Sequence, residues 1–204
     1  MPTIETLTLF AGVALFFAAV PGPNFIFVLT TSLSQGPGRG QLAVLGVVSG
    51  ALIHISLAVW GLTVLLQTSH LVFRVFQIAG ALFLIYIGLT MLRHSRQGIM
   101  EPRWSPQHTY RNGFVTTLLN PKAAIYYFAF LPQFIDPGLG HIQWQFIVLG
   151  GIQMTAAFTV YTIVAQVAGV ARRFIVRYQG WIRPLSGIVY IGLGIWVALA
   201  NEGI

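Results

Sequence analysis

Two proline motifs mark places where a helix cannot continue. Residues 21–24 read Pro-Gly-Pro-Asn and residues 120–122 read Asn-Pro-Lys, each within a long apolar run. A proline inside a helix removes a backbone hydrogen bond and clashes with the preceding turn, which costs about 3 kcal/mol. Asn120 is a favoured N-cap and Pro121 would take the first helical position; Gly22 and Pro23 have the same order. Each motif is therefore predicted to end one half-helix and start another.

The start of each second half-helix offers the chemistry of an anion site. The first N–H groups of a helix have no partner within it, and the helix dipole places partial positive charge there. Two such starts that point toward each other would suit a carboxylate. A simple proline kink is the alternative for either motif alone. The residues predicted to bind a substrate are Pro21, Gly22, Pro23, Asn24, Asn120, Pro121, Lys122, Tyr126 and Thr159.

Two titratable residues, Lys122 and His54, lie near the middle of apolar runs. A lysine at that depth costs about 2.5–3.5 kcal/mol and marks a functional site by default. It can pair with a substrate carboxylate, carry a coupling proton because burial disfavours its charged form, or bond to carbonyls freed by the broken helix. His54 shares a helical face with small residues and is expected to point inward, where it can relay protons. A hydrogen-bonded core histidine is the alternative.

Other polar residues complete the candidate set. Tyr126 and Tyr127 follow the second motif and can face a substrate ammonium with their rings, or simply pack. Asp136, at the end of the same run, is either an entry point for protons or a solvated loop residue. The residues predicted for proton coupling are Lys122, His54 and Asp136. One polar helical face, which lines a pathway or contacts a neighbouring helix, comprises Thr155, Thr159, Thr162 and Gln166.

The composition requires a lipid environment for the elements that carry these residues. The 204 residues are 56% hydrophobic and only 7% charged, with a mean hydropathy of +0.78. A soluble domain has roughly 25% charged residues. The apolar runs are long and continuous rather than alternating, which indicates helices instead of a barrel. The sequence therefore predicts an all-α integral membrane protein.

The apolar runs predict six transmembrane helices. They cover residues 6–31, 40–66, 70–92, 112–134, 144–169 and 182–201. Six spans place alternate connections on opposite sides, and nearly all arginines then fall on one side, which is the cytoplasmic one. Both termini are predicted to lie outside; an inward N-terminus with one span missing is the competing topology. The net charge of +7 is thereby explained by membrane sidedness, without nucleic acid as a partner.

The two halves of the chain look related. The sequence Tyr-Ile-Gly-Leu occurs at residues 86–89 and again at 190–193, and the two proline motifs fall at matching places. A unit of three helices repeated once must insert upside down the second time, which gives an inverted repeat. The predicted organisation is a single membrane domain, 1–204, with repeats at 1–93 and 111–204 and a cytoplasmic loop at 94–110. Chance similarity between apolar helices is the alternative.

Several other function classes lack the residues that they need. The chain has no cysteine, which excludes disulfides and thiolate metal sites. No ligand cluster predicts a metal, and no cofactor is expected. An intramembrane serine protease needs a Gly-x-Ser-Gly setting, and the residue two before Ser49 is Val47. The chain is therefore not expected to be an enzyme.

With these motifs the chain resembles the LysE/RhtB family of amino-acid exporters. The resemblance rests on residues 21–24, on Gly36, Gly40, Gly46, Gly50, Gly61 and Gly80, on residues 86–88 and 120–124, and on Leu131-Pro132-Gln133-Phe134. It implies an exporter of amino acids or their derivatives in the bacterial cytoplasmic membrane, driven by proton exchange. Many relatives carry an aspartate where this chain has Ala51, so the coupling residue stays open. His54 is similar to the homoserine/threonine branch, which implies threonine, homoserine or its lactone.

The expected mechanism is alternating access of a secondary transporter. A small amino-acid-like solute would enter from the cytoplasm, dock its carboxylate at the two broken helices, and leave on the other side in exchange for protons. A passive channel is the first alternative and an intramembrane enzyme the second. The sequence leaves the substrate, the stoichiometry and the oligomeric state open, a homo-oligomer included.

Overall fold

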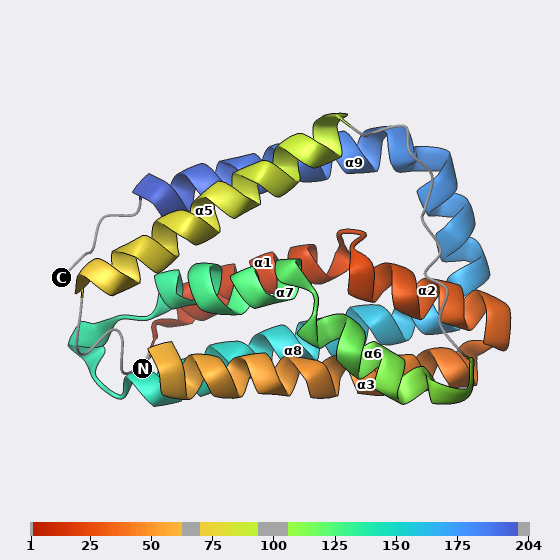
Figure 1. The fold of residues 1–204 in the computed structure, drawn as a ribbon, viewed down its shortest axis with the longest axis horizontal. Coiled ribbons are helices and arrows are strands. Elements are labelled where there is room, and N and C mark those ends of the chain that lie inside the picture. Colours follow the sequence, from red (N-terminus) through yellow and green to blue (C-terminus); the bar gives the residue numbers. More distant parts are fainter. Residues whose placement is uncertain (1, 63–69, 94–105, 200–204) are drawn as a thin grey trace.

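The computed structural model describes residues 2–62, 70–93 and 106–199, and within these ranges all regular secondary structure is helical (Figure 1). Two helices, Pro37–Gly61 and Ile142–Gln166, are each long and apolar enough to cross a membrane. A bent pair of helices, Ile4–Ala19 with Pro23–Gln35, would make a third span, and shorter apolar helices run over Gln77–Arg93 and Pro184–Leu199. The prediction of an all-α integral membrane protein is confirmed.

The first apolar run breaks at its proline motif. Helix α1 (Ile4–Ala19) is capped by the Thr3 side chain and ends at Val20, and α2 (Pro23–Gln35) starts after Gly22 at an angle of 53° to it. Val20 and Gly22 both have extended backbone conformations. Pro23 occupies the first position of α2, where its missing N–H costs nothing.

The second broken run has the same order of elements. Helix α6 (Thr109–Leu118) stops at Leu119, and α7 (Pro121–Ile125) restarts behind Asn120. The chain continues through a π-helical segment (Tyr126–Phe130) and a 3-10 turn (Leu131–Phe134). The prediction that the first and fourth runs break at their prolines is therefore confirmed.

The remaining helices are continuous. Helix α3 (Pro37–Leu57) passes into a π-helical segment at Ala58–Leu62, and α5 covers His70–Arg93. Helix α8 covers Ile142–Gln166 and α9 covers Ala168–Leu199. Short 3-10 turns lie at Pro106–His108 and Pro137–Leu139. The predicted boundaries for the first five runs agree with these helices to within a few residues where both are described.

The prediction for residues 170–181 is wrong. The predicted spans leave this stretch as a connection, whereas α9 runs through it as helix and carries Pro184 inside. Arg173 and Arg177 lie four residues apart, so they share a face of the helix, and both are exposed. The arginines led to the prediction of a loop. A charged segment that lies outside the hydrocarbon region can still be helical, because a helix satisfies its own backbone hydrogen bonds there too.

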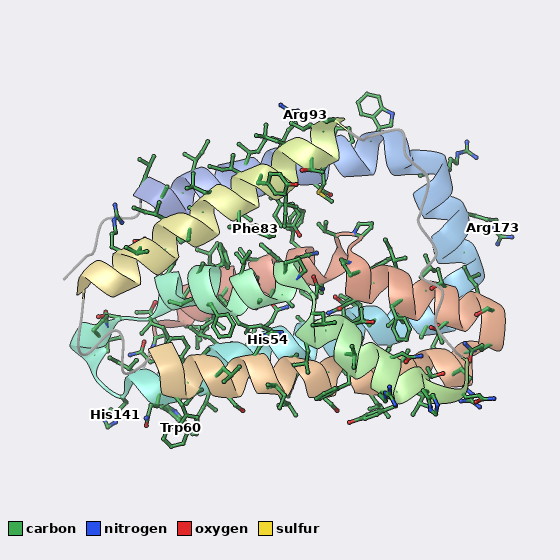
Figure 2. All side chains as sticks on the ribbon, in the orientation of Figure 1. His54, Trp60, Phe83, Arg93, His141 and Arg173 are labelled. Atoms are coloured by element: carbon green, nitrogen blue, oxygen red, sulfur yellow. The ribbon has the colours of Figure 1, made fainter. Side chains whose placement is uncertain are left out.

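The helices pack in pairs around an apolar core. Helix α1 packs on α8, α6 on α3, α3 on α8, and α5 on α9 (Figure 1). His54 lies inside the bundle, whereas Trp60, Arg93, His141 and Arg173 lie on its outside (Figure 2). Large apolar side chains such as Leu15, Leu45 and Leu52 are exposed on the helices, as lipid contact requires.

Glycines allow a close crossing of α3 and α6. A Cβ atom on Gly46 of α3 would collide with the backbone carbonyl of Tyr110 in α6, and one on Gly113 would lie 2.7 Å from the carbonyl of Ala43. Small residues of this kind let membrane helices approach backbone to backbone. This crossing holds α6, and so the second helix break, against α3.

Candidate functional site

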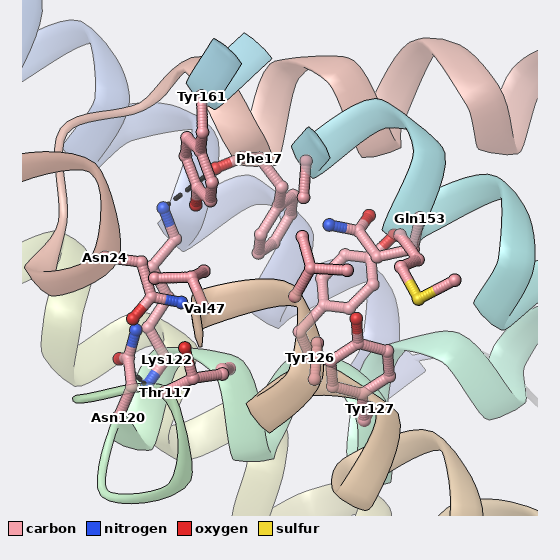
Figure 3. Close-up of a pocket in the computed structure, with 15 residues that line it drawn as sticks. Phe17, Asn24, Val47, Thr117, Asn120, Lys122, Tyr126, Tyr127, Gln153 and Tyr161 are labelled. Atoms are coloured by element: carbon pink, nitrogen blue, oxygen red, sulfur yellow. Dashed lines mark hydrogen bonds between the residues drawn. The ribbon is translucent and has the colours of Figure 1, made fainter. Parts of the chain in front are cut away.

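A cavity lies inside the bundle where the two helix breaks meet (Figure 3). Its volume is about 50 Å³, enough for a few water molecules at about 10–15 Å³ each. The walls come from α1, α2, α3, α8 and the second broken run. The lining residues are Phe17, Asn24, Val47, Val48, Ala51, Thr117, Asn120, Lys122, Ala123, Tyr126, Tyr127, Gln153, Met154, Ala157 and Tyr161.

Lys122 joins the two breaks. Its ammonium donates to the backbone carbonyl of Phe17 at 2.9 Å and to that of Val20 at 3.1 Å, both at the end of α1. These carbonyls belong to the last turn of a helix and have lost their partners in it. The ammonium also lies 5.8 Å from the ring centre of Phe17 and 5.5 Å from that of Tyr190. Of the three roles considered for Lys122, the structure therefore contains the bond to freed carbonyls.

Asn120 caps the restarted helix. Its side-chain oxygen accepts from the backbone N–H of Lys122 at 3.0 Å, and its backbone is extended, as an N-cap requires. Only 3% of Asn120 is exposed. The cap therefore fixes the start of α7 and with it the direction in which the Lys122 side chain leaves the helix.

The start of α2 differs, because its cap residue has no side chain. Gly22 supplies no side-chain hydrogen bond to the first turn. A Cβ atom at Gly22 would lie 3.2 Å from Cδ and 3.4 Å from Nζ of Lys122, so the lysine stem packs directly on this glycine. Asn24, in the first turn, lines the cavity, and its side-chain oxygen has no hydrogen-bond partner among the described residues. The first turn of α2 thus faces the cavity with its positive dipole end.

The structure brings together four of the residues predicted to bind a substrate. Asn24, Asn120, Lys122 and Tyr126 line the cavity. The other four motif residues form the breaks but do not line the cavity; they are Pro21, Gly22, Pro23 and Pro121. Of these, Pro23 and Pro121 are exposed.

Thr159 is not part of the cavity. Thr155, Thr159 and Gln166 are exposed, and Thr155 donates to the carbonyl of Gly151 one turn back. Thr162 accepts from the side chain of Gln41 at 3.2 Å. The polar face of this helix therefore turns outward and toward α3. Thr159, which the sequence predicts to bind a substrate, therefore lies outside the cavity, because another face of α8 lines it.

The lining face of α8 was missed from the sequence. Gln153, Ala157 and Tyr161 follow at intervals of four residues and all line the cavity. Gln153 is 8% exposed, and its side-chain oxygen has no hydrogen-bond partner in the described part of the chain. The i, i+4, i+8 spacing of one amide and one phenol was a usable signal. It was hidden because the adjacent face carries three threonines.

His54 lies next to the cavity and bonds to the second break. Its Nε2 atom is 3.1 Å from the backbone carbonyl of Thr117 in α6, so Nε2 carries the hydrogen and donates. The ring stacks on Tyr127, with centroids 5.8 Å apart and an angle of 12° between planes. Its Nδ1 atom is buried without a partner in residues 2–62, 70–93 and 106–199. His54 is thus both a packed, hydrogen-bonded residue and a site with one free acceptor.

Asp136 lies apart from the cavity. It caps the short turn at Pro137–Leu139 through a 2.8 Å bond from the N–H of Gly138, and its side chain is exposed. The buried amide of Gln145 accepts from the backbone N–H of Asp136 and donates to the backbone carbonyl of the same residue. The structure places Asp136 at an end of the bundle. This position agrees with the second of the two predicted alternatives, a solvated loop residue.

The charge of the site is simple. Lys122 is the one charged residue among those that line the cavity, and none of the lining residues is a carboxylate. Within the described ranges no group of three or more histidine, aspartate and glutamate side chains could hold a metal ion. The cavity therefore offers one ammonium, amides, hydroxyls and apolar walls.

Comparison with known proteins supplies the family. Residues 15–201 match the family described as the LysE type translocator. The chain belongs to the LysE type translocator family. This match covers both helix breaks and every residue that lines the cavity. The protein is accordingly a translocator of the cytoplasmic membrane.

Relatives at moderate identity extend along the chain. An uncharacterized membrane protein of Pseudomonas aeruginosa is 30% identical over 98% of this chain and 99% of its own. A leucine efflux protein of Enterobacter is 34% identical over 67% of this chain and 66% of its own. A leucine efflux protein of Salmonella choleraesuis is 28% identical over 91% of each chain. No solved structure matches the chain.

Proposed function

We propose that this LysE family translocator exports neutral amino acids or their derivatives by proton antiport. The candidates are amino acids of the threonine, homoserine and homoserine-lactone type, together with leucine, because two of the relatives are named leucine efflux proteins. The observation that carries the proposal is the cavity at the meeting point of the two helix breaks. Irregular backbone at membrane depth is tolerated where it lines such a cavity.

The lining supports a neutral side chain on the substrate. Apolar residues, including Val47, Val48 and Ala51 of α3 and Met154 and Ala157 of α8, make up much of the wall. No lining residue is a carboxylate, so a cationic side chain such as that of lysine would lack a counter-charge. Desolvating an unpaired charge is far more costly than burying an apolar group. The chemistry of these walls therefore suits a substrate with a neutral side chain better than one with a cationic side chain.

The first turn of α2 supports docking of the substrate carboxylate. The cap residue Gly22 provides no side-chain acceptor to this turn, and the dipole of α2 favours negative charge here. The ammonium of Lys122 packs against the same glycine and adds positive charge next to it. A carboxylate at this place would compete with the α1 carbonyls for the lysine, which couples substrate binding to the break in α1.

The arrangement around His54 supports proton coupling. Its Nδ1 atom is a free acceptor, and its Nε2 atom donates to the helix that carries the second break. The titratable side chain stacked on it is Tyr127, which lines the cavity. Lys122 is the second candidate for proton transfer, and Asp136 would act only at the end of the bundle.

Matching helix contacts support an inverted repeat of two three-helix units that rock about the cavity. Helix α1, in the first half, packs on α8; α6, in the second half, packs on α3. In the repeat α1 corresponds to α6 and α3 corresponds to α8, so the two contacts are equivalent. In this organisation residues 1–93 and 111–204 form the two units, and both termini lie outside.

The test is uptake into proteoliposomes of radiolabelled leucine, threonine, homoserine, homoserine lactone and lysine, with and without an imposed pH gradient. Antiport predicts accumulation of one or more neutral members that requires the gradient and collapses with a protonophore, and no accumulation of lysine. Equilibration without accumulation under any gradient would instead support the passive channel. Transport of none of the five would contradict the proposal.

A further inference from the structure

Three polar atoms of the cavity are left without hydrogen-bond partners by the described residues. They are the side-chain oxygens of Asn24 and Gln153 and the hydroxyl of Tyr126. Three other cavity residues are already engaged in hydrogen bonds: Lys122 with the α1 carbonyls, Asn120 with the start of α7, and Thr117 with the carbonyl of Gly113. A buried acceptor without a donor is costly, so these three atoms are suited to a ligand.

The free atoms fall into two groups. In Figure 3, Gln153 and Tyr126 lie on one side of the view, and Asn24, Asn120 and Lys122 lie on the other. Asn24 shares its side with the first turn of α2 and with the lysine ammonium, which favour a carboxylate. Its amide can present its NH₂ group to that carboxylate by a half turn of the side chain. Gln153 and Tyr126 have no cationic neighbour in that view.

The helix that carries Gln153 and the ring of Tyr126 are both firmly packed. Gln153 projects from the middle of α8, a helix of 25 residues that packs on α1, α2 and α3. Tyr126 is 2% exposed, and its ring contacts those of Phe17, Phe10 and Phe130 at centroid distances of 4.6, 6.3 and 5.3 Å. Rigid supports of this kind keep a polar atom aimed at one point.

The chemistry of the two atoms selects a hydrogen-bond donor. An amide oxygen only accepts, and a phenol oxygen can accept, whereas an ammonium group only donates. No carboxylate lines the cavity, so the acceptors are neutral dipoles. They can satisfy the ammonium of a zwitterion, whose charge is balanced by its own carboxylate nearby.

We propose that the side-chain oxygen of Gln153 and the hydroxyl of Tyr126 bind the α-ammonium group of the exported amino acid. The substrate then lies across the cavity with its carboxylate toward α2 and its amino group toward α8. The amino group becomes a requirement for binding, and 2-hydroxy acids of the same shape are rejected. The inference rests on the proposed function, since it assigns the second pole of the same substrate site.

The experiment compares amino acids with analogues that lack one pole. Competition with radiolabelled leucine and threonine is measured for unlabelled leucine and threonine, for their 2-hydroxy acid analogues, and for 3-methylbutylamine, which keeps the amino group of leucine and lacks its carboxylate. For the wild-type protein the amino acid should compete about tenfold or more better than its hydroxy acid, as expected for a hydrogen bond to a charged group. Gln153→Met, which keeps the side-chain volume, should shrink this ratio to about threefold or less.

Two variants give the matched controls. Gln166→Met makes the same substitution at an exposed position of α8 and should keep the wild-type ratio. Gln153→Glu keeps an acceptor oxygen, and it should retain the preference for the amino acid and improve competition by 3-methylbutylamine. A third variant, Tyr126→Phe, is a second test and removes only the hydroxyl. The logarithm of the ratio should fall by about half as much as it does in Gln153→Met.

The outcomes separate the two proposals. A wild-type ratio that persists in both Gln153→Met and Tyr126→Phe overturns the ammonium assignment while transport itself stands. If Gln153→Met does not fold, loss of the amino-acid preference in Gln153→Glu overturns it equally. Absence of leucine and threonine transport in the wild-type protein, with all other neutral amino acids also inactive, is failure of the proposed function instead.

Discussion

The ammonium of Lys122 donates to the carbonyl of Phe17, a residue 105 positions earlier in the chain, over 2.9 Å. A second bond, to Val20, ends on the last residue before the first helix break. The last residue of one proline motif thus satisfies the backbone opened by the other. The two breaks form one structural unit, so a substitution at either break should alter the structure of both.

Lys122→Met should weaken the fold and abolish export together. The methionine removes two hydrogen bonds from a charged donor and leaves the carbonyls of Phe17 and Val20 unpaired, which should lower the free energy of unfolding by about 3 kcal/mol. The measurements are thermal unfolding of the purified protein and efflux from loaded proteoliposomes. Thr159→Val, at an exposed position outside the cavity, is the control and should leave both unchanged. Wild-type efflux by Lys122→Met would remove the lysine from the mechanism.

Asn120→Ala should loosen the start of α7. The substitution removes the side-chain oxygen that accepts from the N–H of Lys122, and loss of an N-cap costs about 1 kcal/mol. Asn120→Ser keeps a capping oxygen and should recover most of this loss. Thermal unfolding checks the stability, and the substrate concentration at half-maximal transport checks the site. Equal stability of the alanine and serine variants would mean that the cap contributes nothing.

His54→Gln should uncouple transport from the pH gradient without unfolding the protein. Glutamine can still donate to the carbonyl of Thr117, so the contact between α3 and α6 remains, but it cannot take up a proton. We expect exchange of labelled for unlabelled substrate to continue while accumulation driven by a pH gradient is lost. Gradient-driven accumulation at the wild-type level would contradict this role of His54. Lys122 would then be the better candidate for the coupling residue, since Asp136 lies outside the cavity.

Gly46→Ala should be far more damaging than Gly151→Ala. The new methyl group at Gly46 would collide with the backbone carbonyl of Tyr110, which cannot move without separating α6 from α3. The same change at Gly151 meets nothing within 4 Å. Overpacking of a closed contact costs about 1–3 kcal/mol. Unfolding temperatures of the two variants, measured side by side, should differ clearly, and a Gly46→Ala protein as stable as Gly151→Ala would contradict the close crossing.

The sequence was sufficient for the features that local chemistry determines. Long apolar runs required membrane helices, and prolines 21, 23 and 121 required breaks, because neither depends on what packs nearby. The start of α7 at Pro121 followed from the N-cap preference of Asn120 in the same way.

Features that depend on helix rotation could not be predicted. Thr159 and Gln153 are both polar residues of one apolar helix, and only the packing of α8 on α1 and α3 decides which faces the cavity. The partners of Lys122 were uncertain for a related reason. Every residue has a backbone carbonyl, so the residue type does not indicate which carbonyls bind the lysine. The carbonyls of Phe17 and Val20 come close to Lys122 only in the tertiary structure.

The absence of carboxylates among the cavity residues has an energetic consequence. The lining favours a substrate without net charge, and export of a zwitterion by itself moves no net charge across the membrane. One proton returned for each molecule exported would then carry one elementary charge inward. At 100 mV, inside negative, that charge contributes about 2.3 kcal/mol, enough for a concentration ratio of roughly fifty. Such a carrier would keep extruding its substrate on voltage alone, even in a medium at the same pH as the cytoplasm.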